Sequence, residues 1–268
     1  LRDVTGTVAC VPLIASSILS KKIAGGAQAI VLDVKTGNGA FTPTVASTRE
    51  LAQLMVAIGK RSERRTVALI SDMNQTLGSA VGNALELAEA LDTLRGGGPP
   101  DFRAHCLLLA GQMLRLAGIA EDAAAGQRMA GKALADGSAL AKFRALVAAQ
   151  GGDVAYVDKP KKLPSATLTQ SVEAEDDGFL ARMEAIHIGR AAMMLGAGRA
   201  RKGDPIDQSV GIVVHRKVGA RVRAGGALFT IHANDADTLS RARREALRGV
   251  EITTEKAAAL PLSYGVIE

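Results

Sequence analysis

The sequence has few aromatic side chains: phenylalanine, tyrosine and tryptophan make up 3% of its 268 residues, and tryptophan is absent. Proteins that stack single-stranded nucleic acid need exposed rings, so this scarcity argues against that class. The sequence also lacks an apolar run that approaches the roughly 18 residues of a membrane-spanning helix. We therefore expect neither a stacking platform nor a membrane span.

Cysteine is almost absent too. Cys10 and Cys106 are the only two, and both lie in apolar stretches with a helical pattern. Two isolated thiols argue against a disulfide framework. We expect reduced thiols in the core of a cytoplasmic protein.

The charge balance of the sequence is basic. The formal net charge is +6 and the isoelectric point is about 9.5, which suits an anionic ligand such as phosphate, or nucleic acid. The arginine-rich stretch 240–249 could contact phosphates, but its pattern is more typical of the solvated face of a helix.

The first half of the chain alternates strands and helices. Residues 29–34 and 66–71 are short apolar runs typical of buried strands. Between them lies a helical pattern. Ser47 and Glu50 form a predicted capping box at its start. Strand, helix and strand in this order predict a parallel βαβ unit. Further helices are predicted over these ranges: 12–24, 83–94, 101–117, 121–135 and 138–149.

The second half changes character after a linker rich in proline and lysine at 159–167. Asp177-Gly178 predicts a hairpin turn. Residues 210–233 alternate apolar and polar side chains, which predicts a small antiparallel sheet. A basic helix over 235–248 and a last strand over 250–255 complete this part. The pattern therefore predicts an α/β part followed by a smaller α+β part.

A candidate ligand site lies at the start of the chain. Ser17 and Lys21 are four residues apart on one predicted helix and therefore share a face, and Arg2 lies upstream. Arginine and lysine donate to carbonyl oxygens, and a hydroxyl pairs with an N–H; uracil and thymine carry this pattern of groups. The spacing alone is equally typical of an ordinary polar helix face.

Four stretches together resemble the pyrimidine-nucleoside phosphorylase (thymidine phosphorylase) family. They are "LRDVTGTVACVPLIASSILSKK", "AIVLDVKTGNGAF", "SDMNQTLGSAVGNALELAEALDTLRGGGPPDF" and "VGIVVHRKVGARVRAGGALFTIHAND". The resemblance runs along the whole chain in the family's order. It implies reversible phosphorolysis of thymidine, uridine or deoxyuridine to a free base and a pentose 1-phosphate, with phosphate as co-substrate and no organic cofactor.

The resemblance also implies roles for individual residues. Arg2, Ser17 and Lys21 match the residues that contact the pyrimidine, and Arg2 and Lys21 match the catalytic pair. An apolar wall near the base is implied for Val8, Ile14, Ile18 and Phe41. A monovalent cation such as potassium, which bacterial members of the family hold, is implied at Leu77, Ala80 and Glu89. From the sequence alone, Phe41 could equally be a core residue that covers the strand 29–34, and Glu89 a solvated helix residue.

The family's phosphate-binding elements do not occur in this sequence. No stretch such as "HSTGG" or "GGTxD" is present, and in the family these precede the position of Leu1. The resemblance thus implies a C-terminal portion: a helical remnant (1–24), a central α/β domain with a largely parallel or mixed sheet (25–165) and a hammerhead-like α+β domain (166–268). It also implies a homodimer for the full-length protein.

Several alternatives stay open at this stage. The chain could be a catalytically silent fragment, since it lacks those phosphate-binding elements. Residues 211–231 resemble half of a biotinyl or lipoyl carrier but lack the lysine tripeptide that such a carrier needs. The anthranilate phosphoribosyltransferase family shares the helical and α/β plan without the final domain. Lys35, in a glycine-rich stretch, is a candidate cleft residue. We expect structural or solvent-facing roles for the histidines His105, His187, His215 and His232.

Overall fold

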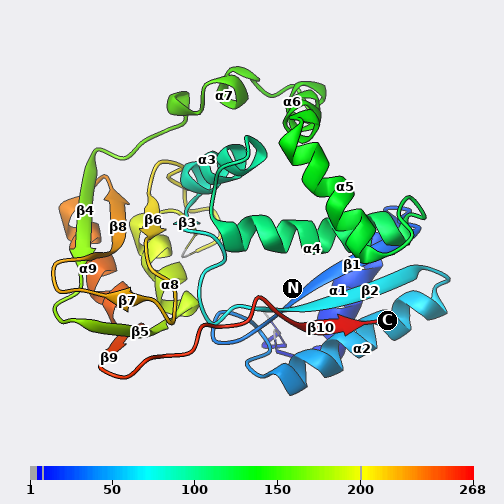
Figure 1. Cartoon of the computed structure of the whole chain (residues 1–268), viewed down its shortest axis with the longest axis horizontal. Coiled ribbons are helices and arrows are strands. Elements are labelled where there is room, and N and C mark those ends of the chain that lie inside the picture. The colour runs from blue at the N-terminus through cyan, green and yellow to red at the C-terminus, as the bar shows by residue number, and fades with distance from the viewer. Residues whose placement is uncertain (1–4, 8, 200) are drawn as a thin grey trace. The chain divides into compact units, whose positions relative to one another are not determined.

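The computed structural model describes residues 5–7, 9–199 and 201–268 (Figure 1). Contacts divide the chain into two compact units. The first comprises Leu1–Met73, Ala104–Lys132 and Pro261–Glu268, and the second comprises Asn74–Arg103 and Ala133–Leu260. Both units combine helices with sheets, so the predicted α/β class is confirmed. The three predicted segments 1–24, 25–165 and 166–268 stay a prediction.

The first unit is built on a sheet with the strand order β1-β2-β10. Its strands are β1 (Ala29–Thr36), β2 (Arg65–Asp72) and β10 (Ser263–Ile267), and its helices include α1 (Val11–Ala24) and α2 (Val45–Arg61). Strands β1 and β2 are parallel, as predicted, and β10 runs antiparallel to β2. Strand β2 is buried almost throughout because it is the central strand. Strand β1 alternates instead, which leaves Asp33 and Lys35 on the face opposite its buried residues.

A hydrophobic core joins α1 and α2 to one face of this sheet. Its fully or nearly buried members include Leu19 of α1, Met55 of α2 and Ile70 of β2. Helix α2 begins one turn earlier than the sequence predicts. Its N-cap is Thr44, which forms the capping box with Ser47, so the predicted box of Ser47 and Glu50 is wrong.

Gly59 marks the closest approach of α2 to β2. A Cβ at this position would lie 2.0 Å from Oγ1 of Thr66. In a helix interior, alanine is more favourable than glycine by about 1 kcal/mol. We nevertheless expect Gly59→Ala to lower the free energy of unfolding by about 1–3 kcal/mol, because the steric clash with Thr66 outweighs the gain in helix propensity. Denaturant unfolding checks this. Adding Thr66→Ala should recover part of the loss, and a Gly59→Ala variant more stable than the native chain would contradict the packing argument.

The second unit contains two further sheets, with strand orders β3-β6-β8-β4 and β7-β5-β9. The strands are β3 (Ala80–Val81), β4 (Leu168–Glu173), β5 (Gly178–Met183), β6 (Gly211–Val214), β7 (Arg221–Val222), β8 (Ala227–Ala233) and β9 (Val250–Thr253). The helices are α3 (Asn83–Leu94), α6 (Ser138–Ala149), α7 (Ala155–Asp158), the 3₁₀ turn η1 (Pro160–Lys162), α8 (Ala185–Leu195) and α9 (Ala236–Leu247). Helices α4 (Pro100–Leu116) and α5 (Ala123–Ala135) each have residues in both units.

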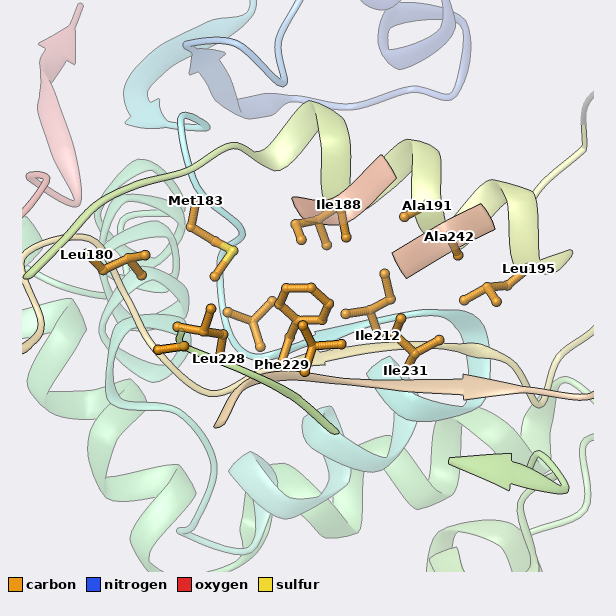
Figure 2. Packing of buried hydrophobic residues seen from close by; sticks show 14 of the residues in the cluster. Leu180, Met183, Ile188, Ala191, Leu195, Ile212, Leu228, Phe229, Ile231 and Ala242 are labelled. Carbon is orange, nitrogen blue, oxygen red and sulfur yellow. The ribbon is translucent and has the colours of Figure 1, made fainter. Parts of the chain in front are cut away.

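A second core packs α8 and α9 against the sheet of β6 and β8. Figure 2 shows Phe229 and Ile231 of β8 facing Ile188 and Leu195 of α8. Phe229 and Ile188 are completely buried. Helix α9 contributes small residues such as Ala242, which is also completely buried, while Arg241 and Arg244 are exposed. The predicted solvated basic face of this helix is therefore confirmed.

Three strand predictions need correction. Strands β4 and β5 flank Asp177 but do not form a hairpin, because β4 pairs with β8 while β5 pairs with β7 and β9. Strand β7 lies within the predicted sheet 210–233 but joins β5 instead of β6 and β8. The last strand is not the one near 250–255: the chain continues to β10, which pairs with β2 in the first unit.

Within the described residues, none of the helices combines the length and the apolar character needed to cross a membrane.

Candidate functional site

Helix α1 presents the first set of predicted site residues. Pro12 lies in its first turn, where a missing N–H costs nothing. Lys21 and Lys22 lie in its last turn, where positive charge complements the helix dipole. Ile14, Ala15 and Leu19 are buried in the first core. These three residues fix the orientation of the helix and so decide which face stays accessible.

Ser17 and Lys21 lie on α1 one turn apart. The Ser17 side chain is half-buried and Lys21 is exposed, and Lys21 makes no ion pair within the part of the chain that the structure describes. Residues four apart on a helix have Cβ atoms about 5–6 Å from each other, so one planar ligand can reach both side chains. Arg2 and Val8, predicted for the same site, lie outside the described residues.

The apolar positions differ in accessibility. Ile14 is 3% exposed and belongs to the first core, whereas Ile18 is partly buried at its margin. Phe41 is 66% exposed in the loop after β1, so the alternative that it is a core residue is wrong. Cys10 is exposed at the N-cap of α1, which also corrects its predicted place in the core.

A polar cluster lies near the carboxyl end of β1. Asp33 and Lys35 of β1, Ser71 of β2 and His105 of α4 form this strand-end cluster. Oδ2 of Asp33 lies 2.8 Å from Nζ of Lys35 and 2.6 Å from Nε2 of His105. The Ser71 hydroxyl donates to Oδ1 of Asp33. One carboxylate thus receives hydrogen bonds from three side chains.

The charge of Asp33 is stabilised strongly. Burial raises the pKa of Asp33, but hydrogen bonds from His105, Lys35 and Ser71 outweigh this effect and bring it down to about 2. Because the ionised carboxylate of Asp33 can only accept, His105 donates Nε2–H to it. Nδ1 of His105 is buried and has no partner among the described atoms. This cluster carries fixed charge at the end of a parallel strand, where α/β sheets generally bind ligands.

The glycine-rich loop after β1 is held at both of its sides. The amide of Gly37 donates to the carbonyl of Thr42 at 3.2 Å, and that of Gly39 donates to the carbonyl of Met73 at 3.0 Å. Lys35 precedes this loop, but its ammonium is engaged by Asp33. Its role as a cleft residue stays a prediction.

Sequence reasoning missed most of the strand-end cluster. Asp33 and Lys35 alternate with apolar residues on β1, so their common face could have been inferred from the period of two. His105 is 72 residues from Asp33 along the chain, so no local sequence pattern predicts that the two side chains are in contact. Its structural role as a buried histidine agrees with expectation, since its side chain is 3% exposed and paired. Burial also raises the pKa of Cys106, the residue next to it, and so keeps that thiol protonated.

Two of the predicted cation ligands, Ala80 of β3 and Glu89 of α3, are hydrogen-bonded to each other, and Leu77 belongs to the loop before β3. Oε2 of Glu89 accepts hydrogen bonds from the amides of Ser79 at 2.9 Å and Ala80 at 3.0 Å. Glu89 is half-buried, so the solvated alternative for it is wrong. The role of Leu77, Ala80 and Glu89 in holding a monovalent cation stays a prediction.

Opposing effects act on the pKa of Glu89, and burial is the largest of them. Burial raises its pKa above the ordinary value, against the lowering effects of the two amides and of Lys217. Among the described residues, no group of three or more histidine, cysteine, aspartate or glutamate side chains is arranged for a metal ion. An ion held by Leu77, Ala80 and Glu89 would therefore rely mainly on carbonyl oxygens.

Two protein-family models match this chain. The model of the glycosyl transferase family, a/b domain, matches residues 1–140, and that of the pyrimidine nucleoside phosphorylase C-terminal domain matches residues 179–253. The chain belongs to the pyrimidine-nucleoside phosphorylase family. The predicted resemblance is therefore confirmed. The second match includes the whole stretch 211–231 that resembles half of a carrier domain.

Curated relatives of the chain carry the same family name. It is 53% identical over 234 residues to a pyrimidine-nucleoside phosphorylase of Geobacillus stearothermophilus, covering 87% of this chain and 54% of the relative. Identity is 54% over 234 residues to that of Staphylococcus haemolyticus, again 87% of this chain and 54% of the relative. It is 51% over 237 residues to that of Staphylococcus aureus (strain USA300), with shares of 88% and 55%. The chain thus spans about half the length of the curated relatives it matches.

Proposed function

We propose that this protein catalyses the reversible phosphorolysis of pyrimidine nucleosides and that this chain carries the half of the site that binds the base. The observation that carries the proposal is the pair Ser17 and Lys21, one turn apart on the accessible face of α1 in a chain of this family. Relatives more than 50% identical are named pyrimidine-nucleoside phosphorylases.

The chemistry needs charge stabilisation more than a covalent nucleophile. A phosphate oxygen attacks the anomeric carbon, the bond from that carbon to the base nitrogen breaks, and its electron pair leaves with the base. Negative charge then spreads to the base's carbonyl oxygens. Lys21 and Arg2 donate to these oxygens, and the Ser17 hydroxyl pairs with the ring N–H. Hydrogen-bond donors fixed where the charge develops lower the activation barrier. Holding the two reactants together lowers it further.

The proposal also includes a co-substrate and a bound ion. Phosphate is the co-substrate. A monovalent cation is held by the carbonyls of Leu77 and Ala80 and by the carboxylate of Glu89. The two amides that hold Oε2 of Glu89 next to Ala80 support this assignment. When bound, the ion supplies a fixed positive charge to its loop. A homodimer stays a prediction of the family resemblance.

Release of free base tests the proposal. We expect thymidine, uridine or deoxyuridine to give base only when phosphate is present, and adenosine to give none. The assay is run on the chain alone and on the chain mixed with the N-terminal half of the Geobacillus stearothermophilus relative. Activity of the chain alone would exclude a silent fragment. Absence of pyrimidine release in both samples, together with no binding of thymine or uracil, would contradict the proposal.

A further inference from the structure

The ammonium group of Lys217 lies in a shell of oxygen atoms within the second unit. Nζ lies 2.6 Å from the carbonyl oxygen of Thr76 and 2.9 Å from Oδ2 of Asp101, and it also donates to the carbonyl of Gly78. The side chains of Lys217 and Asp101 are each 30% exposed. This lysine lies between β6 and β7, whereas its acceptors belong to the loop before β3 and to the first turn of α4. We call these acceptors the Lys217 shell.

In the loop before β3, the main-chain carbonyls bind a positive charge and the main-chain amides bind negative charges. The carbonyls of Thr76 and Gly78 receive the ammonium, while the amide of Gly78 donates to Oδ2 of Asp101 at 3.2 Å. The next two amides donate to Glu89. Gly78 has φ +67°, and a Cβ there would lie 2.2 Å from Oε1 of Glu89. The carbonyls of the loop therefore bind a cation, while its amides bind the carboxylates of Asp101 and Glu89.

The composition of the shell is that of a site for a monovalent cation. Two peptide carbonyls and one carboxylate oxygen are hard ligands of low total charge, and K⁺ and NH₄⁺ have nearly the same radius as the ammonium head of lysine. The hydroxyl of Thr76 is buried and has no partner within the described residues, so this residue offers one more oxygen. The shell differs in its oxygen atoms from the set of Leu77, Ala80 and Glu89.

We propose that the Lys217 shell is a monovalent-cation site that the protein fills from within, using the ammonium of Lys217 in place of a free ion. Lys217 holds the 75–82 loop in shape without depending on the salt in solution. The second contact of the same segment supports this role, because the amide of Val218 donates to the Gln75 side chain at 2.9 Å. The proposal does not rest on phosphorolysis, since the stability of the loop is its readout.

The test removes the ammonium and offers ions in its place. In choline chloride, Lys217→Met should lower the melting temperature by about 5 °C, because Asp101 and two carbonyls lose a charged donor. Replacing choline with K⁺ or NH₄⁺ at equal ionic strength should restore at least half of this loss, and Na⁺ should restore less. The matched control is Lys256→Met, which removes an exposed lysine of the same unit; it should melt and respond like the native chain.

Two further variants separate the shell from its neighbour. Adding Asp101→Asn to Lys217→Met should abolish the rescue by K⁺, whereas adding Glu89→Gln should leave it. Equal effects of K⁺ and choline on Lys217→Met, or rescue that survives Asp101→Asn, would overturn the proposal. If Lys217→Met does not fold, the native chain still decides: the ammonium protons of Lys217 should exchange at least tenfold more slowly than those of Lys256 in NMR spectra. Equal exchange rates would overturn it as well.

Discussion

Replacing Lys21 with alanine should lower kcat/KM for pyrimidine phosphorolysis by about 100-fold or more, because it removes a donor aimed at the charge that develops on the leaving base. Binding of thymine or uracil, measured by calorimetry, should weaken in parallel. Stability should change by no more than about 0.5 kcal/mol, since Lys21 is exposed and contributes only to the end of α1.

Lys22 supplies a matched control for this prediction. It is the next residue of α1, it is also exposed, and it lies in the same last turn. A helix turns by about 100° per residue, so its side chain points away from the face that Ser17 and Lys21 share. We expect Lys22→Ala to keep kcat/KM within about twofold of the native value. Equal base affinity in the native chain and in Lys21→Ala would remove Lys21 from the base site.

Replacing Asp33 with asparagine should lower the free energy of unfolding at pH 7 by about 2 kcal/mol, because Lys35 and His105 lose the carboxylate that both contact. The effect depends on pH in a defined direction. The pKa of Asp33 falls from an ordinary 3.8 to about 2 in the folded chain. A lowered pKa stabilises the fold above the unfolded value, and this contribution disappears as the pH falls from about 4 to about 2.

Unfolding curves recorded from pH 7 down to pH 2 test this prediction. After allowance for partial exposure to solvent, the carboxylate should account for about 1–2 kcal/mol of the acid-dependent loss, and Asp33→Asn should lack that share. Glu50→Gln is the control, because Glu50 is an exposed acid of α2 in the same unit. If Asp33→Asn and the native chain lose the same free energy of unfolding between pH 7 and pH 2, the strand-end cluster does not stabilise the fold.

Local patterns predicted the elements of this fold but not their partners. The helix 83–94 and the parallel pair β1 and β2 follow from periodicity and order along the chain. Asp177-Gly178 predicts a hairpin, but Gly178 begins β5, and the strands on either side belong to different sheets because local residues do not decide which strands pair. Strand β10 was missed because its partner β2 lies almost 200 residues earlier.

The same limit applies to the site. Ser17 and Lys21 could be grouped from the sequence because helix geometry alone places them on one face. Asp33 and His105 could not be grouped, since tertiary packing of α4 decides their contact. Lys217 likewise reaches Thr76 across 141 positions of the chain. Charged residues that come from distant segments therefore required the structure.

The most direct test of the base-binding role of this chain is an NMR titration of the isotope-labelled protein with uracil. We expect saturable shifts of the backbone amides of α1 around Ser17 and Lys21, their loss in Lys21→Ala and no such shifts with adenine. An absence of saturable shifts, or identical shifts with adenine and with Lys21→Ala, would contradict the conclusion that α1 recognises the pyrimidine.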